Sequence, residues 1–176
     1  MPKADIVVAG ERLADRTARL LAEVAAPVLE VGPGSTALDV VREEPAGSGP
    51  LAALAAGGRA LAERGAGRRD ALVVAVDMPF LDSALLRLLR DAPRAHAVVP
   101  RVDGRAQPLC ARYSPVAFRR AAELVAGGAR AMHALLAAID VRWLEEDEWH
   151  AVTTAACFVD IDTPEDARRA GIEVPG

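Results

Sequence analysis

The chain has 176 residues, of which 52% are hydrophobic and 3% aromatic, and its formal net charge at pH 7 is −4. Its single lysine is Lys3 and its arginines are scattered without a basic cluster, which excludes a typical nucleic-acid-binding surface. No apolar run reaches the roughly 18 residues of a membrane-spanning helix, and no signal-peptide pattern opens the sequence. We therefore expect one domain over residues 1–176, soluble and cytoplasmic, with Cys110 and Cys157 as buried thiols.

Short apolar runs between turn-forming residues predict the strands. The clearest run is 71–76, which is uniformly apolar, as is typical of a strand covered on both faces of a parallel sheet. Segments with helical spacing of apolar residues separate these runs. The predicted strands are 28–31, 38–41, 71–76, 96–100, 109–113 and 157–161, and the predicted helices are 11–25, 50–65, 82–91, 115–126 and 132–139. This alternation predicts an α/β fold of three layers around a mostly parallel central sheet.

Asp77 follows the apolar run 71–76 directly. Ligands of open α/β sheets bind at the carboxyl ends of the strands, so a carboxylate at this point is a candidate site residue. The alternative is that Asp77 only caps a turn or the helix that follows. Position alone favours neither interpretation.

The last predicted strand runs into "FVDIDTPEDARRA", in which Thr163 and Pro164 carry the signature of a helix start. Asp160 and Asp162 precede that helix. If this strand neighbours the one that ends at Asp77, these carboxylates converge on one crevice and offer Mg²⁺ the oxygen ligands it prefers. The alternative is that Asp160 and Asp162 face solvent or pair with arginine.

A glycine-rich loop, Gly47-Ser48-Gly49, precedes Pro50 and an alanine- and leucine-rich helix. Glycine allows a backbone to approach a ligand closely, and the free amides at a helix start can bind an anion or the edge of a base. The same pattern is also typical of a simple tight turn between a strand and a helix.

Three elements in this order, "GSGPLAAL", "VVAVDMPFL" and "FVDIDTPEDARRA", resemble the molybdenum cofactor guanylyltransferases, which are MobA-like nucleotidyltransferases. The resemblance covers nearly all of residues 3–170, including "RVDGRAQPLCARYSP". It implies a Rossmann-like three-layer fold and the transfer of GMP from GTP to the terminal phosphate of molybdopterin, with release of pyrophosphate. It also implies Mg²⁺ as cofactor, GTP and a molybdopterin-type cofactor as partners, and other molybdenum cofactor proteins or a second copy as possible protein partners.

The same resemblance assigns roles to individual residues. Asp77 matches the family's Mg²⁺-binding aspartate. Asp160 and Asp162 match positions that are often asparagine in the family, and their D-x-D-T-P-E-D pattern is also similar to that of related cytidylyltransferases. A CTP-dependent enzyme is therefore an alternative. The residues that match the loop lying against the nucleotide base are Gly49, Pro50 and Leu51.

Cationic residues complete the implied site. Lys3 matches the lysine that ends the family's L-A-G-G-x-S-x-R-M-G-x-x-K signature and neutralises the phosphates. On this alignment we expect the first, central strand and most of the phosphate loop to lie upstream of Met1. A non-catalytic relative that binds a nucleotide or cofactor is therefore a second alternative. Arg101, Arg105 and Arg130 are candidate clamps for the pterin phosphate.

Overall fold

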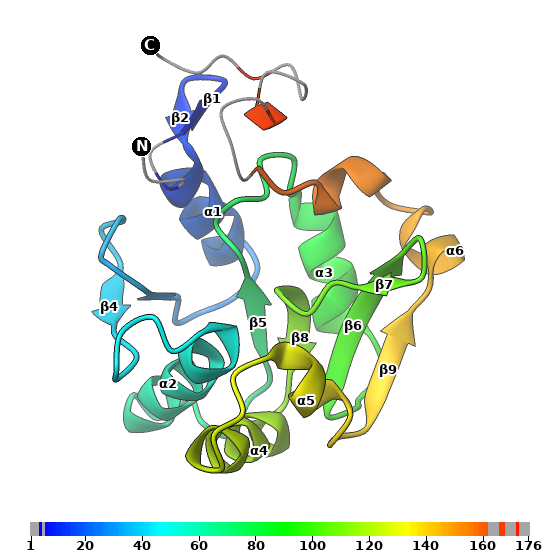
Figure 1. The fold of residues 1–176 in the computed structure, drawn as a ribbon. Coiled ribbons are helices and arrows are strands. Elements are labelled where there is room, and N and C mark those ends of the chain that lie inside the picture. The colour runs from blue at the N-terminus through cyan, green and yellow to red at the C-terminus, as the bar shows by residue number, and fades with distance from the viewer. Residues whose placement is uncertain (1–3, 5, 162–165, 168–171, 173–176) are drawn as a thin grey trace.

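The computed structural model describes residues 4, 6–161, 166–167 and 172 (Figure 1). Its main sheet has the strand order β5-β8-β6, with β7 and β9 both paired to β6. Two smaller sheets each contain two strands, β1 with β2 and β3 with β4. The strands are β1 (Val7–Val8), β2 (Glu11–Arg12), β3 (Leu29–Val31), β4 (Asp39–Val41), β5 (Ala71–Val74), β6 (Ala97–Val102), β7 (Arg105–Ala106), β8 (Cys110–Tyr113) and β9 (Val141–Leu144).

The prediction of a mostly parallel sheet is not confirmed, because β8 runs antiparallel to both of its neighbours, β5 and β6. Strand β9 is parallel to β6, so β5, β6 and β9 share one direction. The reason lies in the connection: the chain returns from β6 to β8 through the short segment 103–109, which includes β7. A connection of this length can join antiparallel strands but not parallel ones, which need a long crossover.

The helices form layers on both faces of the main sheet (Figure 1). One core cluster combines side chains of α1 and α3 with Val98 and Cys110, and a second combines α2, α4 and α5 with Ala97 and Val99. Successive residues of β6 thus contribute to opposite cores, as the pleat of a strand requires. The helices are α1 (Leu13–Ala22), α2 (Pro50–Glu63), α3 (Ser83–Asp91), α4 (Pro115–Ala126), α5 (Met132–Leu136) and α6 (Glu146–Trp149).

The five predicted helices are confirmed, α4 with both of its ends, whereas one of the predicted strands is not. The segment 157–161 is not a strand: a 3₁₀ helix, η2 (Ala155–Phe158), occupies its first half, where the Cys157 amide donates to the carbonyl of Thr154. Strands β1, β2, β7 and β9 were not predicted. No helix of the described residues is long and apolar enough to span a membrane.

Strand β5 is less covered than its apolar sequence predicts, because each of its four residues is only half-buried. A cavity of about 610 Å³ lies between β5 and β3 and reaches both strands. The cavity explains why the residues of β5 are only half-buried.

Arg112 joins the centre of the sheet to the end of α3. It is only 5% exposed, and its guanidinium donates to the carbonyl oxygens of Arg90 at 2.7 Å, Ala92 at 2.8 Å and Pro93 at 2.8 Å. Its Nε lies 3.3 Å from the carboxylate of Asp70. One buried side chain therefore satisfies carbonyl groups that the end of a helix leaves without partners.

Replacement of Arg112 by methionine is expected to lower the free energy of unfolding by about 3 kcal/mol, because three carbonyl groups lose a charged donor and Asp70 loses its partner. Urea denaturation followed by circular dichroism measures the change. The matched control is Arg120→Met on α4, whose exposed ion pair with Glu123 is worth about 0.5 kcal/mol or less. Equal effects of the two substitutions would contradict the role assigned to Arg112.

Candidate functional site

Asp77 lies three residues beyond the end of β5, in a turn. The backbone N–H of Ile161 donates to the carbonyl oxygen of Asp77 at 2.9 Å, so the segment containing Asp160 lies directly against this turn. Asp77 is half-buried and Asp160 is exposed. The two segments are therefore neighbours, which is the condition on which the sequence analysis brought Asp77 and Asp160 together, although the second segment is not a strand.

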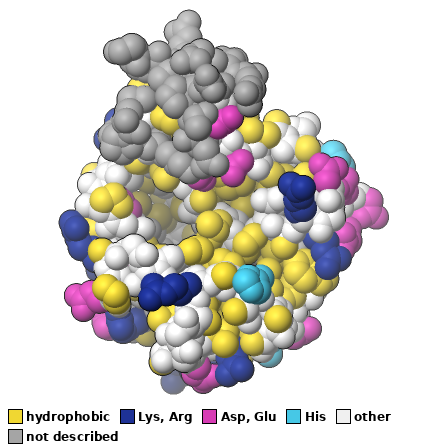
Figure 2. All heavy atoms as spheres, in the orientation of Figure 1, with side chains coloured by type: hydrophobic (Ala, Val, Ile, Leu, Met, Phe, Trp, Pro, Cys, Tyr) yellow, Lys and Arg dark blue, Asp and Glu magenta, His cyan; other side chains and the backbone are white. Residues whose placement is uncertain are grey.

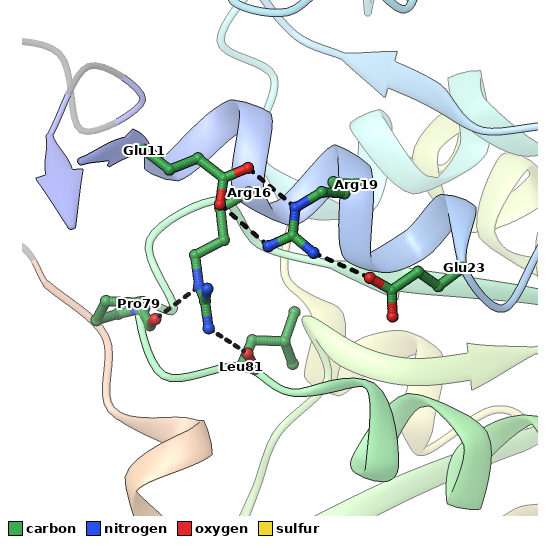
Figure 3. Close-up of polar contacts among 6 residues, drawn as sticks. All are labelled: Glu11, Arg16, Arg19, Glu23, Pro79 and Leu81. Carbon is green, nitrogen blue, oxygen red and sulfur yellow. Dashed lines mark hydrogen bonds and ion pairs between the residues drawn. The ribbon is translucent and has the colours of Figure 1, made fainter. Parts of the chain in front are cut away.

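The turn after β5 is fixed from the side of α1. The guanidinium of Arg16 donates to the carbonyl oxygen of Pro79 at 3.1 Å and to that of Leu81 at 3.2 Å (Figure 3). On the same helix, Arg19 instead pairs with Glu11 and Glu23. No sequence pattern indicates this role of Arg16, because α1 carries two arginines, Arg16 and Arg19, and their spacing does not identify the one that reaches the turn.

The other side of the turn is fixed by a buried polar cluster around η2. The Cys157 thiol donates to the carbonyl oxygen of Phe80, and the Thr153 hydroxyl donates to Oδ2 of Asp82 at 2.6 Å. Asp82 also caps α3, since its Oδ1 accepts the N–H of Leu85 at 2.8 Å. Burial alone would raise the pKa of Asp82, but these hydrogen bonds outweigh it and hold the pKa below its ordinary value.

A second part of the site is the loop before α2. Gly49 has φ of +93°, and a Cβ there would lie 3.3 Å from the carbonyl oxygen of Arg130, so both the conformation and the space favour glycine. The N–H of Leu51 donates to that same carbonyl at 3.4 Å. This contact places Arg130 beside the loop, although Arg130 and Gly49 are far apart in the sequence and no sequence pattern predicts that they meet.

The loop and the Arg130 segment enclose an open pocket of about 470 Å³, here called the loop pocket. The loop pocket connects to the end of β5 because the carbonyl of Leu109, one of its lining residues, accepts the N–H of Ala75 at 2.7 Å. Its lining residues are Gly47, Ser48, Gly49, Pro50, Pro108, Leu109, Arg130, Ala131 and Met132.

The other candidate residues are placed less centrally or are not described. Arg101 pairs with Glu145 at 3.1 Å and lies 3.9 Å above the ring of Trp143, so its guanidinium is already engaged. Arg105 is exposed on β7. Lys3 and Asp162 lie outside the described residues. Within the described part of the chain, no group of three histidine, cysteine, aspartate or glutamate side chains is placed to hold a metal ion.

Solved structures of other proteins share this α/β fold. The structure of molybdopterin-guanine dinucleotide biosynthesis protein A from Archaeoglobus fulgidus superposes with a TM-score of 0.77 at 21% identity, covering 97% of this chain and 89% of that protein. The structure of 2-C-methyl-D-erythritol 4-phosphate cytidylyltransferase from Thermus thermophilus superposes with a TM-score of 0.66 at 22% identity, covering 96% of this chain and 92% of that protein.

The sequence identifies the family of the chain. A family model, the MobA-like NTP transferase domain, matches residues 1–141, and the chain belongs to this family. It is 44% identical over 106 residues to a probable molybdenum cofactor guanylyltransferase of Mycobacterium avium (strain 104), covering 58% of this chain and 52% of that protein. A protein of the same name from Opitutus terrae is 38% identical over 145 residues, covering 78% and 70%. The chain thus spans about half the length of the M. avium relative, and the resemblance stated from the motifs is confirmed.

Replacement of Arg16 by methionine is expected to release the carbonyls of Pro79 and Leu81 and to lower the free energy of unfolding by about 2 kcal/mol. Hydrogen exchange should also accelerate in residues 77–82, because the turn loses its anchor on α1. Arg19→Met on the same helix is the control, since it removes exposed ion pairs and should leave exchange in that turn unchanged. Unchanged exchange in both variants would contradict the role of Arg16.

The lowered pKa of Asp82 predicts a pH dependence of stability. A carboxylate whose pKa is lower in the folded state stabilises the fold above its unfolded pKa, about 3.9, and this contribution disappears as the pH falls through the folded value. The difference in unfolding free energy between the unmodified protein and Asp82→Asn should therefore shrink as the pH falls from about 6 to about 2.5. Denaturation at a series of pH values measures it, and a constant difference would contradict the prediction.

Proposed function

We propose that this chain binds GTP and takes part in the transfer of GMP to the terminal phosphate of molybdopterin, with release of pyrophosphate. The observation that carries the proposal is the position of Asp77 at the end of β5, in a fixed turn against the Asp160 segment, in a chain of the MobA-like family. The names of the M. avium and O. terrae relatives support guanylyl transfer.

The fixed turn suits this chemistry. Nucleotidyl transfer needs little covalent participation from protein groups, and it is accelerated mainly by alignment of the reactants and by neutralisation of phosphate charge. A carboxylate that directs a cation must therefore be held in place. The hydrogen bonds from Arg16 to Pro79 and Leu81, and from Ile161 to Asp77, supply that rigidity.

Mg²⁺ is the proposed cofactor, with Asp77 as its main protein ligand and Asp160 on the adjacent segment as a second. Two carboxylates fit this ion, because Mg²⁺ usually takes one or two from the protein and completes its coordination with water and substrate phosphates. When bound, it would neutralise phosphate charge and orient the α-phosphate of the nucleotide. Asp162 remains a proposed third donor.

The loop pocket is the proposed site of the base. In it, Gly49 allows close approach of the backbone, and Pro50 and Leu51 begin α2. Arg130 is exposed at the same pocket and is the best placed of the arginine candidates to meet an anionic group of either substrate. Arg101 and Arg105 remain proposals for the pterin phosphate, and Lys3 for the phosphates of the nucleotide.

Cytidylyl transfer is the second candidate function. The Asp160-x-Asp162 pattern and the shared fold of the T. thermophilus cytidylyltransferase favour it.

Calorimetric titration with Mg·GTP and Mg·CTP separates these candidates. We expect tighter binding of Mg·GTP, and Asp77→Asn should weaken it by about tenfold or more, because the cation loses its charged ligand. With EDTA in place of Mg²⁺, the unmodified protein and Asp77→Asn should bind GTP with equal affinity.

The matched control is Asp147→Asn, which changes an exposed aspartate on α6 and should bind Mg·GTP as the unmodified protein does. Preference for Mg·CTP would support cytidylyl transfer. A folded chain that binds neither nucleotide would contradict the proposal.

A further inference from the structure

We infer that Cys157 is a positioning residue of the proposed metal site, because its thiol joins the segment that carries Asp160 to the turn that carries Asp77. The inference rests on the proposed function, in which these two carboxylates bind Mg²⁺. The sequence predicted only that Cys157 is a buried thiol. Figure 2 shows acidic side chains at the surface at the end of the molecule to which the β5 arrow points in Figure 1, and the turn after β5 lies at this end.

The two segments lie side by side and run in opposite directions. At one end, the N–H of Ile161 donates to the carbonyl oxygen of Asp77 at 2.9 Å. At the other end, the thiol of Cys157 donates to the carbonyl oxygen of Phe80 at 3.1 Å. The first contact alone would let the Asp160 segment pivot about Ile161. Contacts at both ends fix the separation and the angle of the two segments, and with them the backbone of both aspartates.

The surroundings of the thiol make it a hydrogen-bond donor. Cys157 is 3% exposed, and its Sγ lies 2.7 Å from Oγ1 of Thr153 and 3.2 Å from Oδ2 of Asp82. The Thr153 hydroxyl already donates to that Oδ2 at 2.6 Å. The thiol proton is therefore left for the carbonyl of Phe80, which accepts no other hydrogen bond from the described residues. Burial raises the pKa of the Cys157 thiol, so it keeps this proton at neutral pH.

The thiol and its neighbours are anchored to two helices. Asp82 caps α3, since its Oδ1 accepts the N–H of Leu85 at 2.8 Å. The N–H of Thr153 donates at 3.0 Å to the carbonyl of Trp149, the last residue of α6. Trp149 is fully buried, and its indole N–H donates to the carbonyl of Arg101 in β6 at 3.0 Å. The group that joins the two segments is therefore itself held by the core, as the support of a site has to be.

The spacing of the two segments matters to a cation because each segment supplies one of the proposed ligands. Mg²⁺ demands coordination close to an ideal octahedron, so it tolerates little displacement of a carboxylate. Residues that orient the ligands of a metal without touching it typically change its affinity about 10–100-fold when they are replaced. Cys157 acts in this way, through the backbone of the Asp77 turn and of the Asp160 segment.

Calorimetric titration with GTP at a series of Mg²⁺ concentrations tests the inference on the 176-residue chain. Cys157→Ala should raise the Mg²⁺ concentration needed for half-maximal GTP binding by about tenfold or more, because the two ligands are no longer held at a fixed spacing. The affinity for GTP in EDTA should not change, since the substitution acts on binding of the cation.

The matched control is Cys110→Ala. Cys110 is fully buried in the same core cluster as Cys157, and its thiol makes no hydrogen bond with the described residues. Each substitution removes one sulfur atom from this core, so each should lower the free energy of unfolding. Only Cys157→Ala should change the Mg²⁺ requirement. If the alanine variant does not fold, Cys157→Val and Cys110→Val make the same comparison, because valine fills the space without supplying a donor.

Cys157→Ser separates hydrogen bonding from packing. Serine keeps a donor at this position, so the Mg²⁺ requirement of Cys157→Ser should return to within about threefold of that of the unmodified protein. Amide hydrogen exchange adds a measurement without nucleotide or metal. The N–H of Ile161 should exchange faster in Cys157→Ala and at an unchanged rate in Cys110→Ala, because only the first substitution loosens the Asp160 segment.

The outcomes distinguish the role of Cys157 from the proposed function. An equal Mg²⁺ requirement in Cys157→Ala and Cys110→Ala would overturn the role of Cys157 and leave the proposed binding of GTP intact. A change in Cys157→Ala that serine does not reverse would also overturn it, since the size of the sulfur atom would then matter and not its hydrogen bond. A folded, unmodified chain that binds GTP without any dependence on Mg²⁺, or not at all, would contradict the proposed function and the role of Cys157 together.

Discussion

The backbone groups of the turn after β5 have to find hydrogen-bond partners, and the structure around the candidate site depends on how they do so. Residues 77–81 form no helix or strand, yet each of their carbonyl groups accepts a hydrogen bond: from Ile161, from Leu81 within the turn, from Arg16 twice and from Cys157. A buried carbonyl without a partner costs about 1–3 kcal/mol. The turn is therefore ordered by its own backbone and by contacts from two other parts of the chain, α1 and the segment 157–161, and the backbone of Asp77 is fixed with it.

The need of backbone groups for hydrogen-bond partners also connects the sheet to α3. Asp82 satisfies an amide at the start of α3, and Arg112 satisfies the carbonyl groups around its end. Since Arg112 belongs to β8, the reversed strand fixes α3 as well as pairing with β5 and β6.

Local signals predicted much of this fold. Helix α4 was predicted from its apolar spacing, and in the structure Ser114 caps it and Pro115 opens it. Asp77 was placed at a strand end by the apolar run before it. The direction of β8 is set by its pairing with β5 and β6, and the spacing of apolar residues in a sequence does not indicate the direction of a strand. The run 157–161 has the composition of a strand, but contacts with Asp82 and Phe80 fold its first half as a turn of helix. The approach of Arg130 to Gly49 joins residues distant in the sequence, and no local pattern encodes it.

The reversal of β8 also bears on the order in which the sheet can assemble. Strands β6 and β8 are joined by the short segment 103–109, so their pairing closes a small loop. Pairing of β5 with β8, or of β9 with β6, closes a much longer one and costs more chain entropy. The antiparallel unit of β6, β7 and β8 is consequently the least expensive nucleus of the sheet, and β5, which precedes the Asp77 turn, joins it afterwards.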